Sequence, residues 1–340
     1  MPVTTQAQNP ACPACRSTYT IRKGKRRNRL QTVPIFQCNE CSHRFGGTPG
    51  KHKSYPLKHI LEAVSTYHLG HSVSETLRIL RQRAHLDVPE RTVRSWIATY
   101  RKLATYARLR NAAGKLFPPA RIIQARDLAH QQVYRFQVHM GKLELLLEAP
   151  AHERYAPLKA YFTTVQGDFP HNLFLEPHHR SSTFPASLRP EVQEKQNHAT
   201  ALAKLVLPTS PSNKRRHETL QRFMLVNDSV TVAVEIPIYL TAQDLAYYRS
   251  RGFRLDFESR IITGHIDFLQ IRNGYLHILD YKPEARKEKH AHVQLTIYAL
   301  ALSRRLNLPL KNFKCAWFDE HAYFEFFPLQ SVYRMRQPSR

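Results

Sequence analysis

The sequence predicts a multidomain α+β protein that combines a small cysteine-bound module, a helical module and a larger α/β domain. Cysteines form two C-x-x-C pairs near the N-terminus, residues 56–110 place apolar side chains at helical spacing, and residues 261–282 form two apolar runs joined by Asn-Gly. With 340 residues, 42% of them hydrophobic, the chain is long and apolar enough for two or three domains.

The charge of the chain indicates a polyanionic partner. Lys and Arg number 51 against 26 Asp and Glu, a net charge of +25 (51 − 26). Through Lys115 there are 21 basic and 5 acidic residues, a net of +16 (21 − 5). This excess of basic residues leads us to expect DNA as the partner. No run of 18 apolar residues and no signal-peptide pattern is present, so we expect no membrane association and a cytoplasmic, nucleoid-associated location.

The cysteine pairs predict a zinc ribbon at residues 12–50, after a disordered tail at residues 1–11. Four thiolates are the set that structural Zn²⁺ prefers. They come from two knuckles, Cys12-x-x-Cys15 and Cys38-x-x-Cys41. A redox dithiol or two disulfides are the alternatives, but a redox motif normally lies in a βαβ context, which this stretch lacks.

A basic segment, Arg22–Arg29, lies between the two knuckles. We expect a loop whose Lys25, Arg26 and Arg27 contact the phosphate backbone of DNA without reading its sequence. A solvated loop without a partner is the alternative.

Residues 55–112 predict a module of three helices. The first ends at Leu69-Gly70, Ser72 or Ser74 can cap the second, and Pro89-Glu90 opens the third. The short helices and the tight glycine turn are typical of a helix-turn-helix. An ordinary three-helix bundle is the alternative.

The segments YHLGHSVSETLRIL and VPERTVRSWI resemble the helix-turn-helix of bacterial and archaeal transposases. A zinc ribbon directly before such a module is also a transposase-like arrangement. The resemblance implies a DNA-binding module, with Arg91, Arg94 and Ser95 on the third helix as the residues expected to reach base edges.

The middle of the chain, residues 117–170, predicts a helical connector with a helix over Leu128–Leu147. Residues 170–216 are rich in Pro, Ser, His and Asn and predict long loops. The run Ser229–Leu240 then predicts a central strand, in which Glu235 is the only acid and a candidate extra site residue. Pro237 predicts that this strand ends or lies at an edge there.

A hairpin follows, with strands over Ile262–Ile271 and Tyr275–Lys282. The two-residue turn Asn273-Gly274 fixes the register, so Asp267 and Asp280 face each other on adjacent strands. Two facing carboxylates repel each other, and a divalent cation between them reverses that effect. Lys282 projects from the same face as Asp280, so the hairpin predicts a metal-assisted phosphodiester site. An exposed hairpin with a surface ion pair is the alternative.

The order Gly264-His-Ile-Asp267, Asp280-Tyr-Lys282 and Gln294-Leu-Thr-Ile-Tyr298 resembles the PD-(D/E)xK nucleases over about residues 214–302. The most similar branch is that of RecB-type exonuclease domains and CRISPR-adaptation nucleases. The resemblance implies an α/β domain at residues 171–332 with a mixed central sheet flanked by helices.

The same resemblance implies the site residues. Asp267 and Asp280 would bind Mg²⁺ or Mn²⁺ together with the Tyr281 carbonyl, and Lys282 would orient or activate water. Gln294 and Tyr298 would support the site and touch DNA. The branch also carries an upstream histidine ligand, for which His217 is the first candidate and His198 the second.

Together these patterns predict a metal-dependent DNA nuclease that a zinc ribbon and a helix-turn-helix target to DNA, linked to a mobile element, recombination or repair. A homodimer would supply two sites for duplex cutting, and a transposase or helicase could be its partner. A DDE-type transposase or recombinase is one alternative, with Asp127, Asp168 and Glu176 as the acids. A DNA-binding regulator with an inactive nuclease-like domain is the other.

Overall fold

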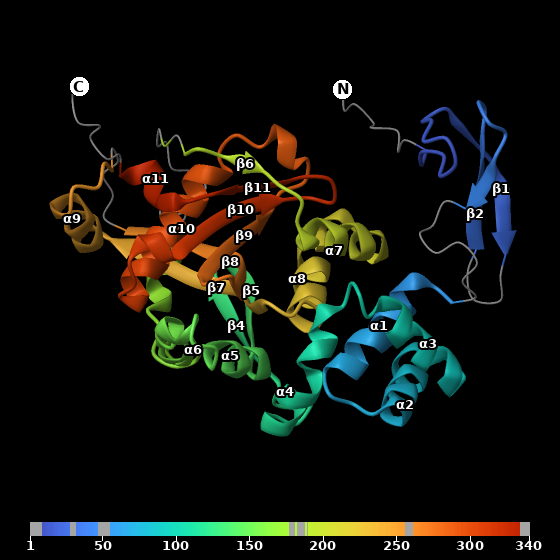
Figure 1. Ribbon diagram of the computed structural model, residues 1–340, viewed down its shortest axis with the longest axis horizontal. Helices are drawn as coiled ribbons and strands as arrows, with labels where there is room; N and C mark the ends of the chain where they lie inside the picture. The colour runs from blue at the N-terminus through green and yellow to red at the C-terminus, as the bar shows by residue number, and fades with distance from the viewer. Residues whose placement is uncertain are drawn as a thin grey trace.

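The computed structural model describes residues 9–27, 32–46, 55–176, 181, 188, 190–255 and 261–333 (Figure 1). The N-terminal part is a three-stranded antiparallel sheet in the order β1-β2-β3. Its strands are β1 (Thr20–Arg27), β2 (Thr32–Cys38) and β3 (Arg44–Gly46).

The basic segment of this part forms a strand, so the prediction of a loop is wrong for Lys25, Arg26 and Arg27. These three residues pair with Pro34, Val33 and Thr32 of β2. Their side chains remain exposed. Arg29 and residues 1–8 of the predicted tail lie outside the described residues.

The three predicted helices of the helical module are confirmed as α1 (Leu57–His68), α2 (Val73–Ala84) and α3 (Glu90–Tyr100). Ser72 caps α2, since its hydroxyl accepts a hydrogen bond from the Glu75 N–H at 3.1 Å. Gly70 follows α1 with a φ of +106°, a conformation that favours glycine. A 3-10 turn, η1 (Thr105–Arg108), and α4 (Arg110–Leu116) lead to the larger domain.

The larger domain is built on an eight-stranded sheet in the order β4-β5-β7-β8-β9-β10-β11-β6. The sheet is mixed, as predicted, because β9 and β10 are parallel while their neighbours are antiparallel. Parallel neighbours need a crossover connection, which α10 (Ala291–Leu306) provides. The strands are β4 (Ile123–His130), β5 (Gln132–His139), β6 (Gln193–Glu194), β7 (Thr231–Thr241), β8 (Ile261–Arg272), β9 (Tyr275–Tyr281), β10 (Phe313–Phe318) and β11 (Tyr323–Phe326).

Helices cover both faces of this sheet and enclose two hydrophobic cores. One face packs against α10 and four shorter helices, which are α5 (Met140–Leu147), α6 (Pro157–Gln166), α9 (Ala242–Ser250) and α11 (Pro328–Val332). The other face packs against α7 (His198–Val206) and α8 (Arg216–Asn227). Figure 1 shows α7 and α8 between the sheet and the helical module. Residues of the module, including Leu61 and Trp96, belong to the same buried cluster as Phe268 and Tyr281 of the sheet.

The predicted helix over Leu128–Leu147 is wrong for its first half. That half is the β4–β5 hairpin, paired from Ile123–His139 to His130–Gln132. Buried Phe136 and Val138 lie two residues apart, which is the period of a strand, and the Val133 side chain is 73% exposed. The spacing of apolar residues in this stretch fits the period of a helix as well as that of a strand. Within the predicted range, Met140–Leu147 forms a helix. Residues 117–170 are therefore not a helical connector, since they add two strands to the sheet.

The predicted end of a strand at Pro237 is also wrong. β7 runs on to Thr241 and lies between β5 and β8. Proline is tolerated there because β5 pairs with β7 only at Ala233 and Val234, so no ladder hydrogen bond from residue 237 is lost on that side.

The prediction of long loops over residues 170–216 is wrong for His198–Val206, which forms α7. Asn197 caps this helix by accepting a hydrogen bond from the Ala199 N–H at 2.9 Å. In the described ranges, no helix has the length and apolar character that crossing a bilayer requires.

Candidate active site

The β8–β9 hairpin brings Asp267 and Asp280 together. Asn273 and Gly274 have φ angles of +51° and +74°, as a type I′ turn requires. The paired residues of the two strands run from Arg272–Tyr275 to Phe268–Leu279, which is the predicted register. Asp267 and Asp280 are the next residue on each strand and therefore face each other. The Tyr281 N–H also donates to Asp267 Oδ2 at 3.1 Å, which fixes the position of that carboxylate.

His217 of α8 completes this cluster. Its Nε2 donates to Asp267 Oδ2 at 2.6 Å, and ligand atoms of His217, Asp267 and Asp280 all lie within 4.8 Å of one another. His198, the second candidate, does not reach the site, since its Nε2 lies 2.8 Å from the Leu103 carbonyl oxygen. The Tyr281 ring packs edge-on against His217, with centroids 5.1 Å apart. The Tyr281 carbonyl as a ligand stays a prediction.

The pKa values of the two aspartates shift in opposite directions, although each has a cationic neighbour, His217 at Asp267 and Lys282 at Asp280. Burial would raise the pKa of Asp267, but the charge and hydrogen bond of His217 hold it below its usual range. Burial, followed by the charge of Asp267, raises the pKa of Asp280 well above its usual range. For His217, burial would lower the pKa, but Asp267 raises it to about 9.

These residues fit a divalent cation. Asp280 Oδ2 is buried and accepts no hydrogen bond, although Lys282 Nζ lies 2.8 Å away as an ion pair. Two carboxylates and an imidazole offer oxygen and nitrogen ligands that suit Mg²⁺ or Mn²⁺. A bound cation would remove the repulsion that the two buried carboxylates now exert on each other.

A chain of hydrogen bonds holds the predicted Lys282, Gln294 and Tyr298 at the site. Lys282 Nζ donates to Gln294 Oε1 at 3.1 Å, and Gln294 Nε2 donates to the Tyr298 hydroxyl at 2.7 Å. Burial would lower the pKa of Lys282, but Asp280 outweighs it and raises the pKa. Lys282 is therefore held as a cation.

Gly264 is required by the close approach of Tyr298. A Cβ at this position would lie 2.4 Å from Tyr298 Cε1 and 3.0 Å from Ser181 Oγ. Any larger residue would push Tyr298 away from Gln294. The glycine three residues before Asp267 is thus explained by packing.

Glu235 lies beside Asp267 on the neighbouring strand. It falls between the pairs Val234–Phe268 and Ile236–Ile266 and has a φ of +52°, which is rare for a residue with a side chain. Burial and the charge of Asp267 raise its pKa to about 7. Gln221 Nε2 of α8 donates to Glu235 Oε1 at 2.7 Å. Backbone strain of this kind concentrates at functional sites. Its position as the only acid in an apolar strand was the signal in the sequence.

The cluster opens into a pocket of about 320 Å³. The pocket is also lined by rings that the sequence did not point to, those of His130, Tyr134, Phe174 and His265. The His130 Nδ1 atom lies 2.8 Å from His265 Nε2, and the rings of Tyr134 and His265 stack with centroids 3.6 Å apart. His130 and Tyr134 come from the β4–β5 hairpin, so the incorrect helix prediction hid their position.

A second metal-binding set is formed by the four predicted cysteines, Cys12, Cys15, Cys38 and Cys41. Their Sγ atoms lie 3.5 Å apart in the pairs Cys12–Cys41 and Cys15–Cys38, and all four lie within 4.8 Å of one another. Tetrahedral Zn–S bonds of about 2.3 Å give sulfur–sulfur distances of about 3.8 Å. None of the four is in a disulfide. The cysteines therefore fit Zn²⁺.

The predicted DNA-contacting residues of the helical module lie on the exposed face of α3. Arg91, Arg94 and Ser95 are exposed, while Val93 and Trp96 face the core. Arg94 forms an ion pair with Glu90 at 2.6 Å. The acids of the transposase alternative do not assemble: in the part of the chain that the structure describes, the metal-capable groups are the cysteine set and the cluster of His217, Asp267 and Asp280.

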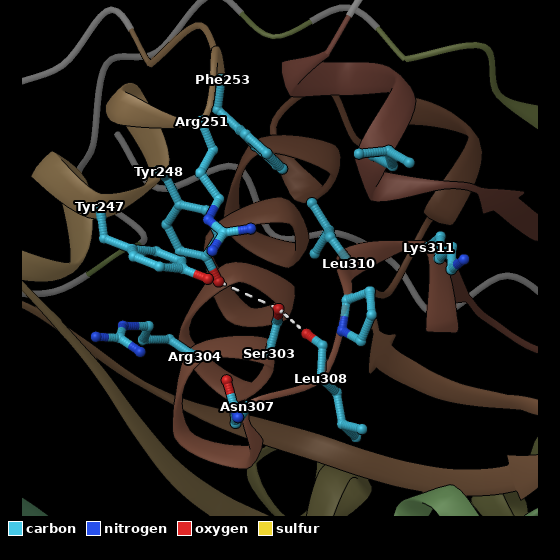
Figure 2. A pocket seen from close by; sticks show the side chains of 12 residues that line it. Tyr247, Tyr248, Arg251, Phe253, Ser303, Arg304, Asn307, Leu308, Leu310 and Lys311 are labelled. Atoms are coloured by element: carbon cyan, nitrogen blue, oxygen red, sulfur yellow. Dashed lines mark hydrogen bonds between the residues drawn. The ribbon is translucent and has the colours of Figure 1, made fainter.

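Another pocket, of about 370 Å³, lies at the opposite end of α10 from Gln294. Figure 2 shows Tyr247, Arg251 and Ser303 among the side chains that line it. Among the residues that the structure describes, no carboxylate lines this pocket, so they do not supply the ligands of a catalytic metal site.

Comparison with known proteins agrees with this geometry. A family model described as the PD-(D/E)XK nuclease superfamily matches residues 142–326. The match covers more than half of the chain and all of the cluster of His217, Asp267 and Asp280. It begins on α5, inside the range predicted as a connector. No curated protein and no solved structure gives a significant match. The chain belongs to the PD-(D/E)XK nuclease superfamily.

Proposed function

We propose that the protein is a DNA nuclease that hydrolyses phosphodiester bonds with Mg²⁺ or Mn²⁺ held by His217, Asp267 and Asp280. The observation that carries the proposal is the convergence of these three ligands next to Lys282. A bound cation supplies a Lewis acid for the phosphate and lowers the pKa of attacking water.

The protein side chains would act around that cation. Lys282 is held as a cation between Asp280 and Gln294. It therefore suits a role in orienting water and offsetting negative charge on the phosphate, rather than accepting a proton. Gln294 and Tyr298 would keep Lys282 in position.

The N-terminal modules would bring the site to DNA. We propose Zn²⁺ at the four cysteines, backbone contacts from Lys25, Arg26 and Arg27, and base contacts from Arg91 and Arg94 of α3. The exposure of these side chains and the net charge of +25 support this role. The transposase-like order of the two modules supports a link to a mobile element, with a transposase or helicase as partner. A homodimer would supply two sites for duplex cutting.

A cleavage assay on the zinc-loaded protein tests the nuclease proposal. We expect cleavage of labelled DNA when Mg²⁺ or Mn²⁺ is added and none when both are left out. Lys282→Ala should lower kcat by about 10²–10³-fold, because the charge aimed at the developing oxyanion is lost. Lys159→Ala, which removes an exposed lysine paired with Glu144, is the matched control and should cleave like wild type.

Substrate shape separates the modes of cleavage. Cutting of closed circles would mark an endonuclease, and cutting of linear DNA alone would mark an exonuclease. Tight DNA binding with no cleavage of circular, linear or single-stranded DNA under either metal would contradict the proposal and favour the DNA-binding regulator.

A further inference from the structure

A groove of about 420 Å³ separates the helical module from the nuclease domain. Its walls come from α1, the end of α2, the segment before α8, and α8 itself. Among the described residues that line it, four are cations and two are acids: Lys58, Arg83, Arg215, Arg222, Glu62 and Glu218.

The four cations of the groove are available to a ligand. All four are exposed. In the described ranges of the chain none of them is in an ion pair, whereas Glu62 lies 3.6 Å from His59. A concave surface with unpaired cations attracts a polyanion, and the field is focused by the low-dielectric walls.

Helix α8 connects this groove to the active site. His217 and Gln221, one turn apart, contact Asp267 and Glu235 on the side of the sheet. Glu218 and Arg222, each one residue further along, line the groove. One helix therefore carries catalytic-site residues on one face and groove residues on another.

The two walls of the groove are fixed relative to each other. At the C-terminal end of α8, Asn227 Oδ1 lies 2.8 Å from His68 Nδ1, and Asn227 Nδ2 donates to Ser65 Oγ at 2.8 Å. Ser65 and His68 both lie on α1, and buried residues of α1 and α8 belong to the same hydrophobic core. A nucleic acid strand bound in the groove would therefore follow a fixed path relative to His217.

We propose that this groove binds the phosphate backbone of the nucleic acid strand that the active site cuts. The identity of the strand as substrate rests on the proposed function, but the groove as a phosphate-binding surface does not. The helical module would then act as one wall of the substrate channel as well as a DNA-binding module in its own right.

Equilibrium binding tests the groove independently of cleavage. The zinc-loaded full chain is titrated with fluorescent single-stranded and duplex DNA over a range of salt concentrations, without Mg²⁺ or Mn²⁺. Each lost phosphate contact should make the slope of log K against log salt shallower by about 0.7 for a single strand and about 0.9 for duplex. We expect this change for Arg222→Gln, with weaker binding, and tighter binding for Glu218→Gln.

Arg251→Gln is the matched control, because Arg251 is an exposed arginine that lines the other pocket at the far end of α10 (Figure 2). It removes the same charge and should leave the slope unchanged. Thermal melts verify that each variant is folded, as expected for exposed positions. A wild-type slope for Arg222→Gln, or an equal change for Arg251→Gln, would overturn the proposal. Groove-dependent binding without any cleavage would overturn the nuclease proposal alone.

Discussion

Asp280→Asn is expected to abolish cleavage while DNA binding persists. The substitution keeps the shape of the side chain but removes a charged ligand from the cluster of His217, Asp267 and Asp280. Metal catalysis supplies several kcal/mol of transition-state stabilisation, and each 1.36 kcal/mol is tenfold in rate, so we expect a loss of about three orders of magnitude or more. Single-turnover cleavage rates test the loss of cleavage, and DNA affinity measured on the same preparation tests the retention of binding.

The same variant should not be less stable than wild type in the absence of divalent ions. Burial and the charge of Asp267 raise the pKa of Asp280, so the ionised carboxylate opposes folding until a cation is bound. We expect Mg²⁺ or Mn²⁺ to raise the Tm of wild type but not of Asp280→Asn.

Asp244→Asn provides the control for a buried aspartate away from the cluster. Asp244 is 4% exposed and forms ion pairs with Arg304 and Arg305. Removing its charge leaves Arg304 and Arg305, whose side chains are 37% and 21% exposed, without their carboxylate partner, so Tm should fall while metal-dependent cleavage remains. Retained cleavage in Asp280→Asn would show that the catalytic cation is held elsewhere.

Cys38→Ser is expected to unfold the N-terminal module. Cys38 is fully buried, and in the described part of this module the cluster around it consists of Phe36, Phe45 and Cys12. Structural zinc sites contribute about 10–16 kcal/mol of apparent binding free energy, which such a small core cannot replace. The variant should lose its zinc, become sensitive to protease within residues 12–46, and bind DNA with a shallower salt dependence.

Cys315→Ala is the matched control for this experiment. Cys315 is a buried thiol of β10 in the core of the larger domain. Its replacement should lower Tm slightly and leave zinc content, measured by elemental analysis, at the wild-type value. Full zinc content in Cys38→Ser would exclude the four-cysteine site.

The hairpin of the candidate active site was predictable from the sequence because the rules that determine its geometry are local. Asn273-Gly274 specifies one turn type, the turn sets the register, and the register places Asp267 opposite Asp280. The spacing of Gln294 and Tyr298 likewise follows from a single helical turn. The cysteine pairs and the three helices of the helical module depend on equally short-range patterns.

The contacts that local patterns do not encode were missed. The apolar residues of the β4–β5 hairpin fit a helix as well as a strand. His130 and Tyr134 were therefore expected on a helix, and their position in the pocket was missed. Glu235 was visible as a lone acid, but its strained backbone depends on the pairing of β7 with β8. The packing of the helical module against α8 depends on contacts such as Ser65–Asn227, between residues 162 positions apart.

Mn²⁺ titration of the zinc-loaded protein tests the metal site most directly, because it needs no knowledge of the substrate. Calorimetry on wild type, Asp267→Asn and Asp244→Asn would report the affinity of the site. We predict saturable Mn²⁺ binding in wild type and Asp244→Asn, and its loss or a weakening of at least about tenfold in Asp267→Asn. Equal Mn²⁺ affinity in wild type and Asp267→Asn would contradict the assignment of His217, Asp267 and Asp280 as the catalytic metal site.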